Sequence, residues 1–187
     1  MLIAVLGPDG SGKTTLARSI SEAHKSVEYV YLGHNQMERD YRIGNEFIKG
    51  RLSQSVLIKP FRRFLITFND WVEYRISKKV HNVSDRCIID ALIGTRIFKR
   101  KMRYYYELVL KVFPKPDFVI LLDGDADKIW QRKKELTPDL IRTYISDYKN
   151  YLDRNSVNYT TIDTVKNNLE ESKAKAIQMI ESCLKKS

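Results

Sequence analysis

The sequence predicts a three-layer α/β protein in which a parallel sheet of five strands carries helices on both faces. Short apolar runs rich in β-forming residues alternate with longer stretches of helical periodicity along the 187 residues. A glycine-rich segment joins the first apolar run directly to a helical pattern, and no repeat or linker divides the chain. Such alternation is typical of βαβ units, so residues 1–187 are expected to form one domain.

Hydrophobicity identifies four of the five strands. They are Leu2–Leu6, 27–32, 118–122 and 159–162. The remaining strand has two candidates. Segment 80–84 is weakly hydrophobic, whereas 87–89 is more apolar and lies just before Asp90. Either segment could lie beside the first strand of the sheet.

Helical periodicity follows the first strand and recurs in four later segments. The predicted helices are Lys13–Ala23, 60–79, 104–112, 138–155 and 168–184. In the second of them Phe61, Phe64 and Phe68 lie at helical spacing, and we expect these aromatic rings to join the core. Thr137 and Pro138 form a typical helix start, with threonine as the cap and proline in the first position.

The strongest motif is segment 7–14, Gly-Pro-Asp-Gly-Ser-Gly-Lys-Thr, which satisfies the pattern G-x-x-x-x-G-K-[ST] between a strand and a helix. Its glycines let the backbone N–H groups approach an anion, and the helix adds the positive end of its dipole. We predict that Lys13 reaches the β- and γ-phosphates of a nucleotide and that the Thr14 hydroxyl ligates Mg²⁺. The residues predicted to bind the nucleotide are Gly7, Asp9, Gly10, Ser11, Gly12, Lys13, Thr14 and Thr15.

The composition favours a polyanionic partner, because 33 Lys and Arg against 23 Asp and Glu give a formal charge of +10. Basic and aromatic residues are interleaved at Arg62, Arg63, Phe64, Phe98, Lys99, Arg100, Lys101 and 103–106. This mixture could bind single-stranded nucleic acid. We favour a solvated helix face over an aromatic core, because no recognised nucleic-acid-binding module accompanies the patch.

No apolar run approaches the roughly 20 residues that cross a bilayer, and the first strand begins at the N-terminus. We therefore expect neither a signal peptide nor a membrane partner. We expect the protein to be cytoplasmic. Cys87 and Cys183 lack the spacing of a metal site, so no chemistry is assigned to them.

Four segments resemble the thymidylate kinase-like branch of the P-loop nucleoside monophosphate kinases. They are 7–17, the set Asp85, Arg86 and Asp90, the run Pro-Lys-Pro-Asp-Phe-Val-Ile-Leu-Leu-Asp at 114–123, and Arg-Lys-Lys-Glu-Leu-Thr at 132–137. The resemblance extends over almost the whole chain. It implies the P-loop NTPase fold with strand order 2-3-1-4-5, and Mg²⁺-dependent transfer of the γ-phosphoryl group of ATP to a nucleoside or deoxynucleoside monophosphate, with dTMP as the first acceptor to try.

The resemblance also assigns roles to single residues. It implies that Asp85 holds Mg²⁺ through water, that Arg86 binds the acceptor's phosphate, and that Asp9 acts near the donor phosphates through Lys13 or Mg²⁺. Asp9 could equally well form a local turn contact. A lid around 131–143 would close over the phosphates and exclude water. Its cations are Arg132, Lys133, Lys134 and Arg142. The residues expected to act in catalysis are Lys13, Asp85, Arg86, Arg132 and Arg142.

The chain departs from the family pattern in the region of the acceptor. Thymidylate kinases carry a Thr-Arg-Glu-Pro-Gly-like segment after the second strand, and residues 32–39 do not match it. His34 or Arg39 could replace its arginine. Cys87 stands where a tyrosine usually follows the Asp-Arg pair. Because of these departures, the sequence does not determine which nucleobase the acceptor carries.

Two other functions fit the sequence less well. A kinase for the hydroxyl group of a nucleoside or sugar would need a carboxylate base, for which Asp85, Asp90 and Glu38 are available. A nucleic-acid-associated P-loop nucleotide-binding protein would use the basic aromatic surface instead. The long aromatic helix from Pro60 resembles elements through which related kinases dimerise, so a homodimer is a further expectation.

Overall fold

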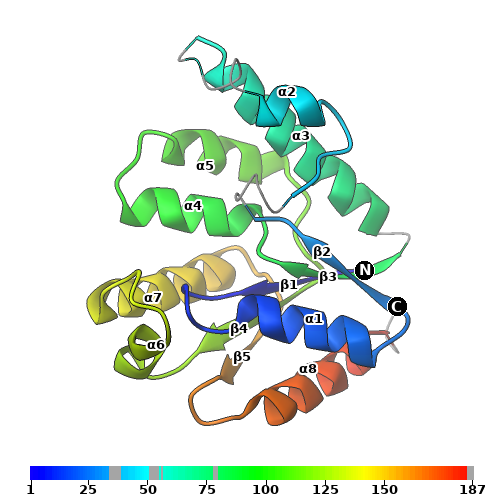
Figure 1. The fold of residues 1–187 in the computed structure, drawn as a ribbon, viewed down its shortest axis with the longest axis vertical. Helices are drawn as coiled ribbons and strands as arrows, with labels where there is room; N and C mark the ends of the chain where they lie inside the picture. Colours follow the sequence, from blue (N-terminus) through cyan, green and yellow to red (C-terminus); the bar gives the residue numbers. More distant parts are fainter. Residues whose placement is uncertain (34–38, 51–54, 56, 78–79, 185–187) are drawn as a thin grey trace.

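The computed structural model describes residues 1–33, 39–50, 55, 57–77 and 80–184. Five parallel strands form one sheet in the order β2-β3-β1-β4-β5, which confirms the expected topology (Figure 1). The strands are β1 (Leu2–Leu6), β2 (Val27–Tyr31), β3 (His81–Asp85), β4 (Phe118–Asp123) and β5 (Tyr159–Asp163).

The third strand is His81–Asp85, so the alternative placement at 87–89 is wrong. Strand β3 lies between β2 and β1, in the middle of the sheet, yet it buries the polar side chains of Asn82 and Ser84. Ser84 Oγ donates to the Ile3 carbonyl oxygen at 3.3 Å. A central strand with polar side chains at buried positions lacks the apolar run by which strands are recognised.

Eight helices accompany the sheet in the described part of the chain. They are α1 (Lys13–Ala23), α2 (Asn45–Lys49), α3 (Lys59–Ser77), α4 (Ile88–Ile97), α5 (Arg103–Val112), α6 (Ala126–Arg132), α7 (Pro138–Arg154) and α8 (Leu169–Leu184). All five predicted helices are confirmed to within two residues. The sequence reasoning missed three helices: α2, α4 and α6.

The sheet separates two hydrophobic clusters because alternate residues of each strand face opposite sides. Ile3 and Val5 of β1 face α1 and α8, whereas Leu2, Ala4 and Leu6 face α4, α5 and α7. Helix α6 packs against α7 in a smaller cluster of its own. Because β1 pairs in parallel with β3 and with β4, the carboxyl ends of these three strands lie at one edge of the sheet. Ligands of such folds bind at this edge.

Helix α3 does not place its phenylalanines in the core. Phe61, Phe64 and Phe68 are 55%, 56% and 37% exposed, so the expectation that they are core residues is wrong. The helix instead buries Ile66 and Tyr74, together with two polar residues described below. Helical spacing of apolar residues identifies a face of the helix, but it does not show what covers that face.

A buried ion pair fixes the segment after the second strand onto α3. Arg39 Nη1 lies 2.5 Å from Asp70 Oδ1, and both side chains are less than 5% exposed. Burial raises the pKa of Asp70 to about 6, although the Arg39 guanidinium opposes this rise. The neighbouring Asn69 donates to the Ile43 carbonyl oxygen and accepts from the Ile43 N–H, so polar contacts join this segment to α3 in addition to the apolar cluster of Tyr41, Ile48 and Ile66.

No helix in the described ranges is long and apolar enough to span a membrane.

We predict that Asp70→Asn lowers the free energy of unfolding by about 3 kcal/mol, because it leaves the charge of Arg39 buried without a counter-ion. Urea unfolding followed by circular dichroism measures this change. Asp40→Asn is the matched control, because Asp40 pairs with Lys49 at 2.6 Å but is 89% exposed. It should leave stability unchanged. Equal losses in the two variants would show that the buried pair contributes no more than the exposed one.

Candidate active site

The phosphate loop, residues 7–12, joins the end of β1 to the start of α1. Gly7 and Gly12 adopt φ angles of +152° and +90°, which residues with a Cβ rarely reach. A Cβ on Gly7 would lie 2.8 Å from Ser11 Oγ and 2.9 Å from the Leu122 carbonyl oxygen. A Cβ on Gly12 would meet no described heavy atom within 4 Å. The loop is therefore packed tightly against the sheet and open near the helix start.

Lys13, the first residue of α1, extends its side chain back over the phosphate loop. Its Nζ donates to the carbonyl oxygens of Gly7 (2.9 Å) and Pro8 (2.8 Å) and lies 3.4 Å from Asp9 Oδ1. The side chain is only 5% exposed, and burial lowers the pKa of Lys13, as does the nearby Arg86. The ammonium group of Lys13 thus lies next to the first N–H groups of α1. Both the ammonium group and these N–H groups favour the binding of an anion.

Thr14 and Asp85 lie together at the ends of α1 and β3. Thr14 Oγ1 donates to Asp85 Oδ2 at 2.5 Å, and burial raises the pKa of Asp85, with the Thr14 hydrogen bond opposing the rise. The other oxygen, Asp85 Oδ1, is buried without a hydrogen-bond partner among the described residues. An unpaired buried carboxylate oxygen beside a hydroxyl group suits the water-filled coordination shell of Mg²⁺.

The described ranges hold no cluster of three His, Cys, Asp or Glu side chains able to hold a metal ion. A magnesium ion held by Thr14 and Asp85 would therefore need ligands from phosphate and water, as is usual for this metal.

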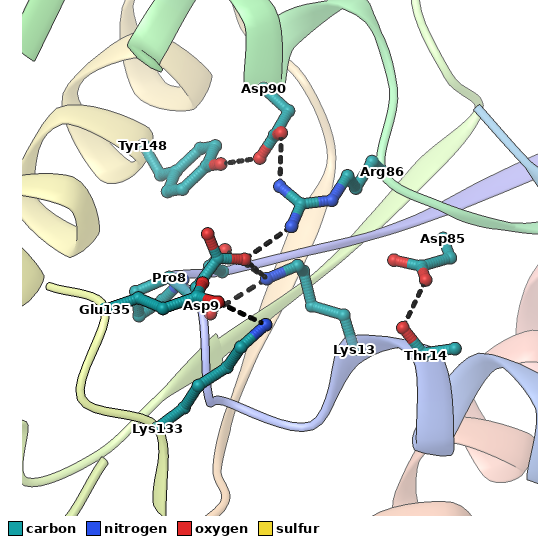
Figure 2. A network of polar contacts seen from close by, with 11 residues as sticks. Pro8, Asp9, Lys13, Thr14, Asp85, Arg86, Asp90, Lys133, Glu135 and Tyr148 are labelled. Atoms are coloured by element: carbon teal, nitrogen blue, oxygen red, sulfur yellow. Dashed lines mark hydrogen bonds and ion pairs between the residues drawn. The ribbon is translucent and has the colours of Figure 1, made fainter. Parts of the chain in front are cut away.

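Arg86 joins the phosphate loop to α4 (Figure 2). It lies in the turn after β3 with a φ of +71°, and its Nη2 donates to Asp9 Oδ1 while its Nη1 donates to Asp90 Oδ2 at 2.7 Å. Burial alone would lower the pKa of Arg86, but Asp90 and Asp9 raise it. Burial alone would raise the pKa of Asp9, but Lys13 and Arg86 lower it. Both groups therefore stay charged.

Asp90 has a second partner on α7. The Tyr148 hydroxyl donates to Asp90 Oδ1, and the side chain of Tyr148 is fully buried. The sequence identifies Asp90 as part of the family resemblance and as a possible base, but it indicates no contact between Asp90 and Tyr148. Nothing in the local pattern indicates this contact, because the two residues lie 58 positions apart.

Two cations of the predicted lid lie beside the phosphate loop. An added Cβ on Gly10 would lie 3.1 Å from Lys133 Cβ, and Lys133 also pairs with Glu135 at 3.2 Å (Figure 2). Arg132 Nη2 donates to the Thr164 carbonyl oxygen at 2.8 Å. The end of α6 is thus fixed between the phosphate loop and the segment after β5.

A cavity of about 480 Å³ opens next to the phosphate loop. Its wall is formed by the start of α1, by Arg132 and by residues 164–169 with the start of α8. Ser11, Gly12 and Thr15 contribute to it, so the cavity continues from the predicted phosphate site. Residues 164–169 were missed in the sequence, although they follow the carboxyl end of a parallel strand, which is the general signal for ligand contacts.

Some residues that the sequence predicts for the site are not found next to the phosphate loop. Arg142 is exposed on α7, where it pairs with Asp127 at 2.8 Å and Asp139 at 2.7 Å. The structure does not bring it to Lys13. Arg39 is buried and forms an ion pair with Asp70. His34 and Glu38 lie outside the described residues.

Several arginines of the basic aromatic patch contact aromatic side chains of the same patch. Arg63 donates to the hydroxyl group of the buried Tyr106 at 2.6 Å. Arg100 lies over the ring of Phe98, with 5.4 Å from Cζ to the ring centroid, and Arg103 lies over that of Tyr104 at 4.5 Å. Tyr106 is therefore withdrawn from the surface, whereas Phe98 and Tyr104 are exposed and each lies beside an arginine.

Comparison with known proteins is consistent with this geometry. The profile of the thymidylate kinase family matches residues 5–176. A probable thymidylate kinase of Archaeoglobus fulgidus is 26% identical over 192 aligned positions, covering 98% of this chain and 96% of the relative.

Two solved structures share the fold. Thymidylate kinase from Candida albicans superimposes with a TM-score of 0.70 and 18% identity, covering 97% of this chain and 91% of that one. Deoxyadenosine kinase from M. mycoides, solved with dCMP and dCDP, gives a TM-score of 0.65 with 16% identity, covering 97% and 100%. At these identities the likeness shows the fold alone.

The packing of the loop predicts unequal effects of two glycine substitutions. Gly7→Ala should lower the free energy of unfolding by about 3 kcal/mol, because its Cβ would collide with main-chain and side-chain oxygens. Gly12→Ala should cost about 1 kcal/mol, since only the left-handed backbone is strained there. Urea unfolding of both variants measures the difference. An equal or larger loss at Gly12 would contradict the tight contact between loop and sheet.

Proposed function

The chain belongs to the thymidylate kinase family, and from this premise we propose that it transfers the γ-phosphoryl group of ATP to a nucleoside or deoxynucleoside monophosphate, with dTMP as the first acceptor to test. In this proposal residues 1–187 form one P-loop kinase domain, and segment 131–143 acts as its lid. The proposed catalytic groups belong to the network of polar contacts around Lys13 and Arg86 (Figure 2).

One observation carries the proposal. The Arg86 guanidinium contacts Asp9 inside the phosphate loop, so a second cation lies beside Lys13 at the edge of the sheet. A phosphate chain on the loop and a phosphate group on Arg86 would then be neighbours. Bringing the two reactants together in a fixed orientation supplies a large part of the rate in such reactions.

The donor nucleotide is proposed to extend from the loop into the cavity beside it. The loop N–H groups and Lys13 would hold the phosphates, and the cavity lined by Arg132 and residues 164–169 would hold the nucleoside. Thr14 and Asp85 are proposed to hold Mg²⁺, because Asp85 Oδ1 is buried without a partner among the described residues. The ion would neutralise phosphate charge that develops during transfer.

The acceptor needs no protein base in this reaction. The second pKa of a phosphate monoester is near 6, so its oxygen arrives ionised at neutral pH. The protein must orient that oxygen and balance the charge on the equatorial oxygens of the transferred group, which Lys13, Arg86 and the lid cations can do. Closure of the lid over the phosphates would exclude water that otherwise hydrolyses ATP.

A kinase for a hydroxyl acceptor is the second candidate, since one fold relative is a deoxyadenosine kinase. Such an enzyme needs a carboxylate free to take a proton. Asp85 accepts from Thr14, and both oxygens of Asp90 are occupied, by Arg86 and by Tyr148. The described carboxylates of the site are therefore better placed to hold cations than to act as a base.

We predict that ADP forms with ATP, Mg²⁺ and one or a few nucleoside monophosphates. A coupled assay over the ribo- and deoxyribonucleoside monophosphates, nucleosides, simple sugars and short oligonucleotides measures it. Turnover with nucleosides and none with monophosphates would overturn the proposal in favour of the hydroxyl kinase. Binding of oligonucleotides with a steep salt dependence and no ADP formation would favour the nucleic-acid-binding alternative.

Lys13→Ala is the inactive control for this assay. It should reduce turnover by at least about a hundredfold, because a preorganised cation is lost from the developing charge. Lys25→Ala removes an exposed lysine just beyond the same helix and should leave turnover unchanged. Full activity in Lys13→Ala would remove the phosphate loop from the reaction.

We further propose that α3 and α5 form the interface of a homodimer. Large apolar side chains are exposed along both helices, which are linked by a 2.8 Å hydrogen bond from Tyr105 to Thr67. The exposed residues are Phe61, Phe64, Phe68, Tyr104, Leu108 and Val112. An apolar surface shared by two neighbouring helices is typical of a protein interface, and most soluble oligomers are symmetric homodimers.

If α3 and α5 form the interface, dimer formation should depend on these exposed apolar side chains. The wild-type protein should elute as a dimer in size-exclusion chromatography with light scattering, and the pair Phe64→Ser and Leu108→Ser should convert it to a monomer. Met179→Ser, on α8, is the control, because Met179 is also 38% exposed. A monomeric wild type, or a dimer that survives the double substitution, would contradict this interface.

A further inference from the structure

A continuous chain of charged and hydrogen-bonding groups links α7 to the phosphate loop (Figure 2). Tyr148 donates to Asp90 Oδ1, Asp90 Oδ2 accepts from Arg86 Nη1, and Arg86 Nη2 donates to Asp9 Oδ1. The four residues come from α7, α4, the turn after β3 and the phosphate loop. The guanidinium of Arg86 is thus held at both ends by carboxylates.

The two carboxylates are held very differently. Asp90 lies in the first turn of α4, its side chain is 14% exposed, and both of its oxygens are engaged. Asp9 lies in a loop, its side chain is 31% exposed, and its second contact is the ammonium group of Lys13. Asp9 can therefore leave Arg86 and keep a cationic partner, whereas Asp90 cannot leave without breaking its bond to a buried tyrosine.

Tyr148 is suited to a permanent role as a donor. Its side chain is fully buried, and burial together with the charge of Asp90 raises the pKa of Tyr148 well above its usual value. The phenol therefore keeps its proton, and its hydroxyl can satisfy one oxygen of Asp90 without adding charge.

The backbone at Arg86 also needs this support. Its φ of +71° is uncommon for a residue with a Cβ, and such a conformation persists where the surrounding contacts determine it. The main-chain N–H of Arg86 donates to the Val5 carbonyl oxygen at 3.1 Å, which fixes the turn. The side-chain contacts then decide the direction of the guanidinium.

We propose that Asp90 and Tyr148 are positioning residues that hold Arg86 for the phosphate of the acceptor, which replaces Asp9 at the Nη2 end of the guanidinium. This inference rests on the proposed function. The exchange keeps one anion at each end of Arg86, so the acceptor's phosphate meets a cation already oriented toward the phosphate loop. Asp9 then remains with Lys13.

Tyr148→Phe tests the inference by calorimetric titration. The titrants are the best nucleoside monophosphate from the acceptor panel, its nucleoside without phosphate, and ATP. We expect the monophosphate to bind about tenfold more weakly to the variant, because a hydrogen bond to a charged group is lost. Nucleoside and ATP should bind unchanged. In the kinetic assay the KM of the acceptor should rise while that of ATP stays constant.

Tyr151→Phe is the matched control. Tyr151 is a buried tyrosine three residues further along α7 and belongs to the same hydrophobic cluster, so it tests the loss of a tyrosine hydroxyl elsewhere on the helix. The control should bind all three ligands as the wild type does. Asp90→Asn is the second variant and should reproduce the phosphate-specific loss, because it removes the charge that holds Arg86.

A double-mutant cycle with Arg86→Ala separates positioning from general damage. If Tyr148 acts through Arg86, Tyr148→Phe should weaken monophosphate binding in the wild type and cause no further loss in the Arg86→Ala background. Additive losses, or equal losses for monophosphate and nucleoside, would overturn the inference.

The same titrations distinguish the failure of this inference from the failure of the proposed function. A wild-type protein that binds nucleosides and does not gain affinity from the phosphate group would refute the proposed function, and with it the role of Arg86. A wild type that gains affinity from the phosphate, with Tyr148→Phe and Asp90→Asn retaining the whole gain, would refute only the positioning role.

Discussion

The contact between Arg86 and Asp9 is the interaction on which the arrangement of the site depends. It joins two segments that lie 77 positions apart in the chain, the phosphate loop and the turn after β3. The surrounding cluster contains two cations, Lys13 and Arg86, and the three carboxylates Asp9, Asp85 and Asp90. Lys13, Arg86, Asp9 and Asp90 tolerate burial because they pair with one another, whereas Asp85 accepts a hydrogen bond from Thr14. In this nucleoside monophosphate kinase-like enzyme, Asp9 thus holds the two cations Lys13 and Arg86 next to each other.

Much of the fold could be predicted from the sequence, because β1, α1 and β4 have strong local patterns. For strand β3 the sequence leaves two candidate segments, because the buried Asn82 and Ser84 of the correct one resemble a loop until the neighbouring strands are known. The phenylalanines of α3 show the opposite error. Their spacing identifies a helix, but the neighbouring contacts that leave them exposed and bury Asp70 instead are tertiary. Local patterns therefore predict elements better than environments.

The candidate site divides in the same way. The phosphate loop and the pair Asp85 and Arg86 could be found, because each is encoded in a few consecutive residues. The cavity wall at 164–169 and the contact between Tyr148 and Asp90 arise where distant segments meet, so no local motif indicates them. The position of Arg142 on an exposed face of α7 likewise depends on the orientation of a helix, which spacing alone does not fix.

Cys87 follows Arg86 directly, and its thiol is completely enclosed by the core between β3 and α4. Burial raises the pKa of Cys87 to about 12, so almost no thiolate exists at neutral pH. Alkylating and oxidising reagents attack the thiolate, and they would first need this turn to open. Modification of Cys87 by a thiol reagent would therefore report local unfolding of the turn beside Arg86, whereas Cys183 is more accessible to the same reagent.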